Sequence, residues 1–291
     1  MKTLNVIGAG RVGRTLAALW RQKQVFTLQD VLDGTPDGAR SAVAFIAEGS
    51  AVERSTAMRA ADVWMIATPD GTIAAAAQAL AAAGLLRSGD IVFHCSGSLA
   101  STEISGVVPG ALAASIHPLK SFADAAAAVL SFRGTFCAAE GDHAALAVLV
   151  PAFESIGGRI YELDPQFKTV YHAASVIVCN YLTALLETGL QCYEKAGLPR
   201  ETATDMIEPL VRVTLENVLR LGTRTGQRGP IARGDDVVVA KHLHALDAWD
   251  ARIGALYRDL GAVALDLARS RGEADPDALG RVEALLRKPP A

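Results

Sequence analysis

Two patterns of apolar residues divide the chain. From residue 2 to about residue 163, short runs rich in β-branched residues alternate with Ala-rich stretches that are long enough for helices. This alternation predicts βαβ units, in which helices cover a parallel sheet. We predict strands at Thr3–Ile7, Val25–Leu32, Val63–Ala67, Ile91–Cys95, Leu112–Ile116, Gly134–Ala138 and Arg159–Leu163.

Downstream of Asp164-Pro165 the strand pattern ends, and apolar residues recur at helical spacing. The chain therefore combines an α/β doubly wound domain over residues 1–163 with an all-α domain over residues 164–291. A length of 291 residues suits two domains of ordinary size. We predict the helices over residues 166–196, 200–221, 236–250, 252–270 and 275–287.

Composition excludes several classes of protein. Hydrophobic residues form 51% of the chain and charged residues 20%, which is enough apolar material for a packed core and too little charge for a disordered chain. The formal net charge is −3, so we expect no broad basic surface and no nucleic acid partner.

The N-terminus and one apolar stretch bear on localisation. Residues 1–8 enter a strand-like run at once, with no apolar segment of the kind found in signal peptides, so we expect a cytoplasmic protein. Residues 169–186 are mostly apolar, but His172, Ser175 and Asn180 would be costly in lipid. We therefore expect a buried helix there and no membrane partner.

A glycine motif carries the most information about function. The hexapeptide Gly-Ala-Gly-Arg-Val-Gly begins at Gly8, directly after the first predicted strand, and opens a predicted helix. In this context the motif is typical of a Rossmann-like dinucleotide site. Gly8 permits the tight turn, Gly10 lets the pyrophosphate approach the backbone, and Gly13 lets the helix pack on the strand. The backbone amides at the helix start, around Arg11 and Val12, face the phosphates. A tight turn without a nucleotide is the alternative.

An acidic residue about 20 positions further on bears on the choice of dinucleotide. Asp33 lies 20 residues after Gly13, at the end of the second predicted strand, and Asp30 is its rival. A carboxylate there accepts the ribose hydroxyls of NAD and repels a 2′-phosphate, so we favour NAD. Arg40 on the following helix leaves NADP open, because an arginine there could bind the 2′-phosphate. The alternative role of Asp33 is that of an ordinary turn residue.

Two loops follow later strands of the predicted sheet. Thr68-Pro69 follows the run Val63–Ala67, and Ser96-Gly97 follows the run Ile91–Cys95. Ligands of open α/β sheets bind at the carboxyl ends of the strands, so we assign both loops to the cofactor site. Turn formation alone is the alternative explanation of each loop.

Four segments together resemble a known family. Besides the glycine motif, they are Ser115–Phe122, Tyr171–Ala174 leading to Asn180, and Gly229–Asp235 leading to His242. Over nearly its whole length the chain resembles the Rossmann-like oxidoreductases that carry a DUF2520-type helical C-terminal domain. It is similar more distantly to the 6-phosphogluconate and 3-hydroxyisobutyrate dehydrogenases, ketopantoate reductase, pyrroline-5-carboxylate reductase and prephenate dehydrogenase. The resemblance implies a nicotinamide-dependent dehydrogenase or reductase and assigns no substrate.

Two departures from these families matter. Members of the DUF2520 family often have a Ser-Arg pair where this chain has Asp33-Gly34, which puts NADP use in doubt. Hydroxyisobutyrate-type enzymes carry a lysine four residues before the helix asparagine. That position is Val176 here, so their catalytic lysine cannot be carried over.

Histidines supply candidate proton donors. His117 follows a predicted strand, and the resemblance to prephenate dehydrogenase-like proteins implies a place near cofactor and substrate, where an imidazole can protonate a carbonyl oxygen. His172 and Asn180 are eight residues apart on a predicted helix, within about 80° of one face and roughly 12 Å apart along the axis. His172 is a second candidate donor, and Asn180 is a candidate contact for the substrate or the nicotinamide amide. A structural polar side chain is the alternative for each.

An Arg-rich segment supplies a candidate anion anchor. Between residues 212 and 233, five arginines stand against one glutamate. Arg233 lies in a glycine-containing turn and is our candidate for holding a substrate carboxylate, with a solvated basic loop as the alternative. Asp235 contacts the substrate or caps the next helix, and His242 on that helix is a third candidate acid. His242 and His244 point about 200° apart on a helix and the cysteines show no CxxC spacing, so we predict no metal site.

Together these residues predict an enzyme that transfers hydride between NAD or NADP and a small carboxylate-bearing carbonyl compound, such as the 2-keto acid ketopantoate. A cyclic imine reductase is the alternative within enzymes. A non-catalytic dinucleotide sensor is the alternative outside them, and Val176 in place of the expected lysine favours it. Because the helical half carries more apolar surface than it needs for itself, we also expect a homodimer formed through that half.

Overall fold

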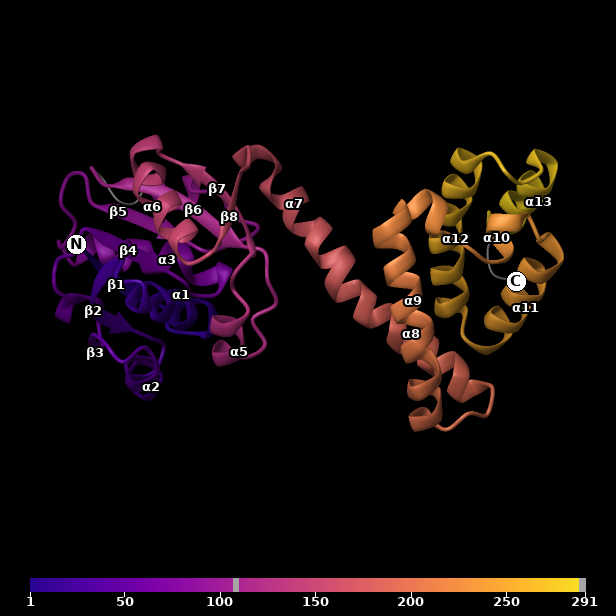
Figure 1. Cartoon of the computed structure of the whole chain (residues 1–291), viewed down its shortest axis with the longest axis horizontal. Helices are drawn as coiled ribbons and strands as arrows, with labels where there is room; N and C mark the ends of the chain where they lie inside the picture. Colours follow the sequence, from indigo (N-terminus) through magenta and orange to yellow (C-terminus); the bar gives the residue numbers. More distant parts are fainter. Residues whose placement is uncertain (107–109, 288–291) are drawn as a thin grey trace. The chain divides into compact units, whose positions relative to one another are not determined.

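The computed structural model describes residues 1–106 and 110–287, and it divides into two compact units, residues 1–180 and 181–291. Figure 1 shows the order of the helices and strands along the chain. The domain boundary predicted at residues 163 and 164 follows the last strand, which ends at Glu162. The first unit extends beyond that strand because the next helix contacts the end of the sheet, as described below.

The N-terminal unit contains a single eight-stranded sheet in the order β3-β2-β1-β4-β5-β6-β7-β8. The seven predicted strands are present, with ends shifted by up to three residues, and the short, largely exposed β3 was missed. The expectation of a parallel sheet is wrong at one place, because β7 runs antiparallel to β6. The bounds are β1 (Lys2–Ile7), β2 (Phe26–Leu32), β3 (Ser50–Val52), β4 (Val63–Ile66), β5 (Ile91–His94), β6 (Leu112–Pro118), β7 (Phe136–Gly141) and β8 (Arg159–Glu162).

The reversal at β7 follows from where its connection ends. The backbone N–H of Leu119, just after β6, donates to the carbonyl of Phe136 at 2.8 Å, so β7 begins beside the carboxyl end of β6 and runs back. Pro118 therefore pairs with Cys137, and Ser115 pairs with Glu140. An antiparallel neighbour needs no crossover to the other end of the sheet.

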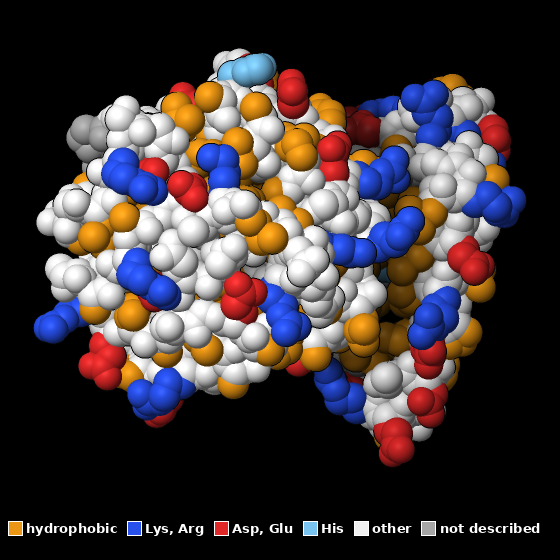
Figure 2. All heavy atoms as spheres, turned by 60° about the vertical axis from the view of Figure 1, so that its left-hand side comes forward, with side chains coloured by type: hydrophobic (Ala, Val, Ile, Leu, Met, Phe, Trp, Pro, Cys, Tyr) orange, Lys and Arg blue, Asp and Glu red, His pale blue; other side chains and the backbone are white. Residues whose placement is uncertain are grey.

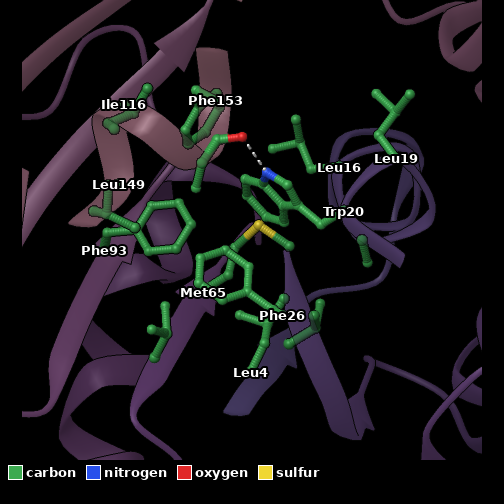
Figure 3. Packing of buried hydrophobic residues seen from close by; sticks show 14 of the residues in the cluster. Leu4, Leu16, Leu19, Trp20, Phe26, Met65, Phe93, Ile116, Leu149 and Phe153 are labelled. Atoms are coloured by element: carbon green, nitrogen blue, oxygen red, sulfur yellow. Dashed lines mark hydrogen bonds between the residues drawn. The ribbon is translucent and has the colours of Figure 1, made fainter. Parts of the chain in front are cut away.

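Both faces of the sheet are covered, as a doubly wound fold requires. Met65 and Phe93 contribute to one apolar cluster, while their strand neighbours Trp64 and Val92 contribute to a second cluster. In the first cluster Trp20 donates through Nε1 to the carbonyl of Ala152 at 2.9 Å, among the rings that Figure 3 shows. The helices of this unit are α1 (Arg11–Gln22), α2 (Pro36–Ile46), α3 (Asp70–Ala82), α4 (Thr102–Ser105), α5 (Ala125–Leu130), α6 (His143–Ser155) and α7 (Lys168–Ser175).

The C-terminal unit is helical, as predicted, and its core joins Val239, Leu243, Leu265 and Val282. The short α10 was missed, and α9 continues past its predicted end, with non-helical backbone at Gly222. A π-helical turn over Val176–Asn180 links α7 to the first helix of this unit. The helices are α8 (Tyr181–Lys195), α9 (Arg200–Gly226), α10 (Pro230–Arg233), α11 (Asp236–Trp249), α12 (Ala251–Arg271) and α13 (Pro276–Leu286).

The stretch Pro165–Lys195 departs from its predicted burial. By length and composition alone it is apolar enough to cross a membrane, which is weak evidence for a membrane span. Only 6% of its most apolar part is buried within the single chain, so the prediction of a buried helix is wrong for the chain by itself. Apolar composition indicates that a segment avoids water, but it does not specify which surface covers the segment.

Charges of both signs are mixed on the face of the N-terminal unit that Figure 2 shows. Lys and Arg side chains lie among Asp and Glu side chains rather than in one patch. Two ion pairs of this unit join Arg59 to Asp30 at 2.8 Å and Arg87 to Asp90 at 3.1 Å. The face in view therefore lacks the continuous basic surface that holds a phosphate backbone.

Candidate functional site

The three glycines of the motif have different surroundings. A Cβ on Gly8, where φ is +88°, would lie 2.6 Å from the backbone nitrogen of Thr68. A Cβ on Gly13 would lie 2.2 Å from the carbonyl oxygen of Gly8, so α1 packs directly on the loop. A Cβ on Gly10 would meet no described atom within 4 Å. Two glycines thus serve close packing, and the third faces open space.

That open space is part of a cavity of about 550 Å³ at the carboxyl edge of the sheet. Gly10 is the N-cap of α1, no acidic residue occupies the first turn, and the first amides of the helix are available to an anion. The hydroxyl oxygen of Thr68 is buried and has no hydrogen-bond partner among the described residues. These features fit a bound dinucleotide. The cavity is lined by Gly10, Arg11, Val12, Ala67, Thr68, Pro69, Ser121, Phe122 and Ala123.

Residues 121–123 in this lining were not assigned to the cofactor from the sequence. They lie three residues after Pro118 and overlap the segment Ser115–Phe122, one of the four that carry the family resemblance. The Arg11 guanidinium donates to the carbonyl of Ala123 at 3.3 Å, which ties this loop to the start of α1. The segment Ser115–Phe122, which resembles the known family, was the feature of the sequence that indicated these residues.

The two acidic candidates for the ribose have different environments. Asp30 is buried, pairs with the Arg59 guanidinium and accepts the backbone N–H of Arg59 at 2.6 Å, so it is unavailable to a ligand. Asp33 follows β2 directly and accepts the backbone N–H of Ala9, inside the glycine loop, at 2.8 Å. Arg40 is exposed and pairs with Asp37 at 2.5 Å. Asp33 therefore remains the candidate, and it also holds the loop in place.

Replacing Asp33 with asparagine separates these two roles. The amide oxygen of asparagine can still accept the Ala9 N–H, while the negative charge is lost. We expect the ratio of NADPH to NADH affinity to rise about tenfold, because the repulsion of the 2′-phosphate is removed. Asp33→Ala removes the loop contact too, so it should weaken NADH binding further. Calorimetric titration with both cofactors measures the ratio, and an unchanged ratio in both variants would make Asp33 a turn residue only.

A second cluster lies at the carboxyl ends of β5 and β6. His117 Nδ1 lies 3.1 Å from the Tyr171 hydroxyl, and the His117 and His172 ring centres are 6.0 Å apart. A Cβ on Gly97 would lie 2.5 Å from His172 Cδ2 and 2.8 Å from His117 Cε1. Only glycine at this position lets both imidazoles approach the loop that follows β5. The structure thus brings His117, His172 and the Ser96-Gly97 loop together.

This environment keeps His117 neutral. Burial lowers the pKa of His117 to about 4, and the nearby His172 and Lys168 contribute in the same direction. In the tautomer in which Nδ1 accepts from the Tyr171 hydroxyl, the single ring proton lies on Nε2. At neutral pH this side chain offers a hydrogen-bond donor and not an imidazolium acid.

A buried lysine next to this cluster was not predicted from the sequence. Lys168 is 1% exposed, and its Nζ donates to Glu140 Oε1 at 2.8 Å and to the Ser115 hydroxyl. Glu140 also accepts the backbone N–H of Ser101 at 2.9 Å and its hydroxyl at 2.7 Å. The Ser115 hydroxyl lies 3.2 Å from His94 Nδ1. Burial lowers the pKa of Lys168, and the bond to Glu140 opposes that shift.

The network positions α7. Lys168, Tyr171 and His172 are spaced i, i+3 and i+4, so they share one face of that helix. Pairing of Lys168 with Glu140 therefore directs the same face toward His117 and Gly97. The sequence does not mark this pair, because only the fold buries the Glu140 carboxylate, which then needs a cation as its partner.

The remaining candidates occupy other places. Asn180 is exposed at the end of the π-helical turn, which alters the phase of the helix and invalidates the angle of about 80° to His172. Arg233 is exposed at the end of α10 in the C-terminal unit. Asp235 caps α11 by accepting the Val238 N–H at 3.2 Å, and His242 Nδ1 lies 3.0 Å from the Tyr257 hydroxyl.

Comparison with known proteins agrees with this architecture. Residues 2–118 match the model of a Rossmann-like domain, and residues 135–264 match a domain of unknown function, DUF2520. Among proteins with curated functions, none matches the sequence significantly.

Several solved structures share the fold. A protein from Thermotoga maritima is 24% identical with a TM-score of 0.73, over 93% of this chain and 100% of that one. A putative NADP oxidoreductase from Bacteroides fragilis is 22% identical with a TM-score of 0.70, over 94% and 98%. An NADH-preferring ketol-acid reductoisomerase from an uncultured archaeon is 15% identical with a TM-score of 0.64, over 97% and 82%. The chain combines a Rossmann-like domain with a DUF2520 domain, as its motifs predict.

Proposed function

We propose that this chain is an NAD(P)-dependent oxidoreductase that transfers hydride between the nicotinamide and a small carboxylate-bearing carbonyl compound. The main observation in support is that the cavity at Gly10 and the neutral imidazole of His117 lie at the carboxyl edge of one sheet. In open α/β sheets that edge is where ligands bind. The names of two similar structures, a putative NADP oxidoreductase and an NADH-preferring reductoisomerase, support the proposal.

The residues of the chain have distinct roles in this proposal. The amides that begin α1 at Arg11 and Val12 hold the pyrophosphate, and the Thr68 hydroxyl supplies a further contact. Asp33 faces the ribose and favours NAD. The cofactor supplies the hydride when it is bound. His117 of the N-terminal unit donates a hydrogen bond to the substrate oxygen. Within the C-terminal unit, Arg233 is the residue that we propose for binding a carboxylate. A 2-keto acid such as ketopantoate is the first substrate to test.

The low pKa of His117 also supports a second candidate, a cyclic imine reductase. A neutral imidazole is a weak acid, and a carbonyl oxygen gains a full proton during reduction. An imine nitrogen is more basic and accepts a proton from solvent before reduction, so it needs less help from the protein. A non-catalytic dinucleotide sensor is the candidate of another class.

One set of assays separates these candidates. Oxidation of NADH and NADPH is followed spectrophotometrically with a panel of 2-keto acids and a panel of cyclic imines. Turnover with keto acids supports the first proposal, and turnover restricted to imines supports the second. Calorimetric binding of a cofactor without turnover on either panel would identify a sensor and overturn both enzymatic proposals.

We also propose a homodimer formed through the helical half. Several large apolar side chains of α8 and α9 are exposed, among them Tyr181, Leu210 and Leu219, which is 85% exposed. An exposed apolar surface of this kind marks an interaction site, and a second copy offers the same surface in return. Light scattering should therefore give about twice the chain mass of 30.4 kDa at micromolar concentration.

Leu219→Glu should shift this mass toward that of the single chain, because a buried carboxylate is costly in an interface. The matched control is Leu130→Glu, a residue of the N-terminal unit that is 88% exposed, which should leave the mass unchanged. A wild-type mass near that of one chain would refute the dimer.

A further inference from the structure

The C-terminal unit contains a cavity of about 390 Å³ that is lined by three arginines. Arg228 lies in the loop after α9, Arg233 ends α10, and Arg271 ends α12. Glu273 and Asp275, between α12 and α13, complete the charged lining. We call this space the arginine cavity.

Two of the three arginine charges are not neutralised there. Arg228 Nη1 donates to the carbonyls of Thr225 at 2.6 Å and Gln227 at 2.9 Å, and these neutral groups leave its charge uncompensated. Within the described part of the chain, neither Arg228 nor Arg233 forms an ion pair. Asp275 caps α13 and also lines the cavity, so the lining carries three positive and two negative side chains. The cavity therefore keeps an excess of positive charge.

One carboxylate already faces these arginines. Glu273 forms an ion pair with Arg271, although the Glu273 side chain is 63% exposed. The hydrogen bond from Arg271 lowers the pKa of Glu273, and the charge of Arg228 lowers it further. Glu273 lies in the short connection between α12 and α13, where its exposed carboxylate contacts Arg271.

The bonding of Arg271 is incomplete even with this carboxylate in place. Nη1 reaches the carbonyl of Gln227 at 3.3 Å, a long contact. Nε is buried without a partner among the residues described, and the same holds for Gln227 Oε1 in the same cavity wall. A guanidinium with an unused donor can rearrange to form the bidentate contact that carboxylates favour.

From these contacts we infer that the arginine cavity binds a small carboxylate, and that the Glu273 carboxylate occupies this position until the ligand displaces it. This inference depends on the proposed function in one respect only, namely that the bound carboxylate is the substrate. Beyond the role proposed for Arg233, it makes the Glu273 carboxylate a competitor of the ligand for the arginines. Binding of the anion is a separate property that needs neither cofactor nor turnover.

The experiment titrates 2-oxoisovalerate into the full-length protein without cofactor and follows binding by NMR. Glu273→Ala should bind this keto acid at least about fivefold more tightly than the wild type, because the competing carboxylate is gone. A gain of affinity cannot arise from misfolding. Arg233→Lys should weaken binding about tenfold, since lysine keeps the charge and loses the bidentate geometry, and Arg271→Met should abolish saturable binding.

Two controls match these variants. Glu208→Ala removes an exposed glutamate that pairs with Arg212 on α9, with the same change of net charge, and should leave the affinity unchanged. Arg224 lies outside the cavity lining, so Arg224→Lys should also leave the affinity for the keto acid unchanged. Equal affinities of Glu273→Ala and Glu208→Ala would overturn the inference. Saturation by inorganic phosphate with no binding of the keto acid would overturn the assignment to carboxylates. Binding as expected in a protein without turnover would leave the inference standing while the proposed function fails.

Discussion

Gly10→Val should abolish dinucleotide binding while the protein stays folded. The expected loss of affinity is at least about 100-fold for both NADH and NADPH, because the valine side chain fills the space next to the first amides of α1. The fold has room for it, since a Cβ at this position meets no described atom within 4 Å and φ is −65°. Calorimetry measures the affinity and circular dichroism the fold.

Gly280→Val is the matched control for this substitution. Gly280 lies on α13, and a Cβ there also meets no atom of the described residues within 4 Å. This variant should bind both cofactors as the wild type does. A folded Gly10→Val protein with unchanged affinity would remove the glycine loop from the cofactor site, whatever the outcome of the activity assays.

Lys168→Met should destabilise the protein by about 3–5 kcal/mol, since it leaves the buried Glu140 carboxylate without its cation. For a unit of this size the melting temperature should fall by roughly 10 °C. At temperatures well below its melting temperature the variant should still bind NADH, because Lys168 does not line the cavity at Gly10. Thermal and urea unfolding measure the change.

The double variant Lys168→Met/Glu140→Gln tests the cause of this loss. Glutamine removes the unpaired charge and still accepts from Ser101, so most of the lost stability should return. Lys120→Met, which removes only a bond to the carbonyl of Ser131, should change stability by less than about 0.5 kcal/mol. If Lys168→Met unfolds like the wild type, the Lys168–Glu140 pair contributes no net stability and does not position α7 in the way described.

Periodicity predicted most of the fold because burial imposes it. The strand runs are apolar on both faces, and the structure places Trp64 and Met65 in clusters on opposite sides of the sheet. The direction of β7 was not predictable in this way, since a buried strand has the same composition in either direction. β3 was missed for a related reason, because a three-residue, mostly exposed strand has too few positions to show a pattern.

The sequence marks positions of the candidate site where backbone conformation constrains the residue. Gly8, Gly10 and Gly97 are such positions, because close approach leaves no space for a side chain or a ligand needs that space. Lys168 could not be found in the same way. Lys168 lies at the start of an apolar helical stretch without any motif around it, and only the fold reveals that Glu140 and Ser115 lie opposite it.

The hydrogen bond between Asp33 and the Ala9 N–H has a consequence for redesign of the protein. The carboxylate that we propose to select against a phosphorylated ribose also accepts a hydrogen bond from the loop that we propose to bind the pyrophosphate. Cofactor preference and loop rigidity are therefore coupled traits at a single position. A variant designed to prefer the other dinucleotide needs a neutral side chain that accepts the Ala9 N–H at this position. Without it, we expect the variant to bind both dinucleotides more weakly.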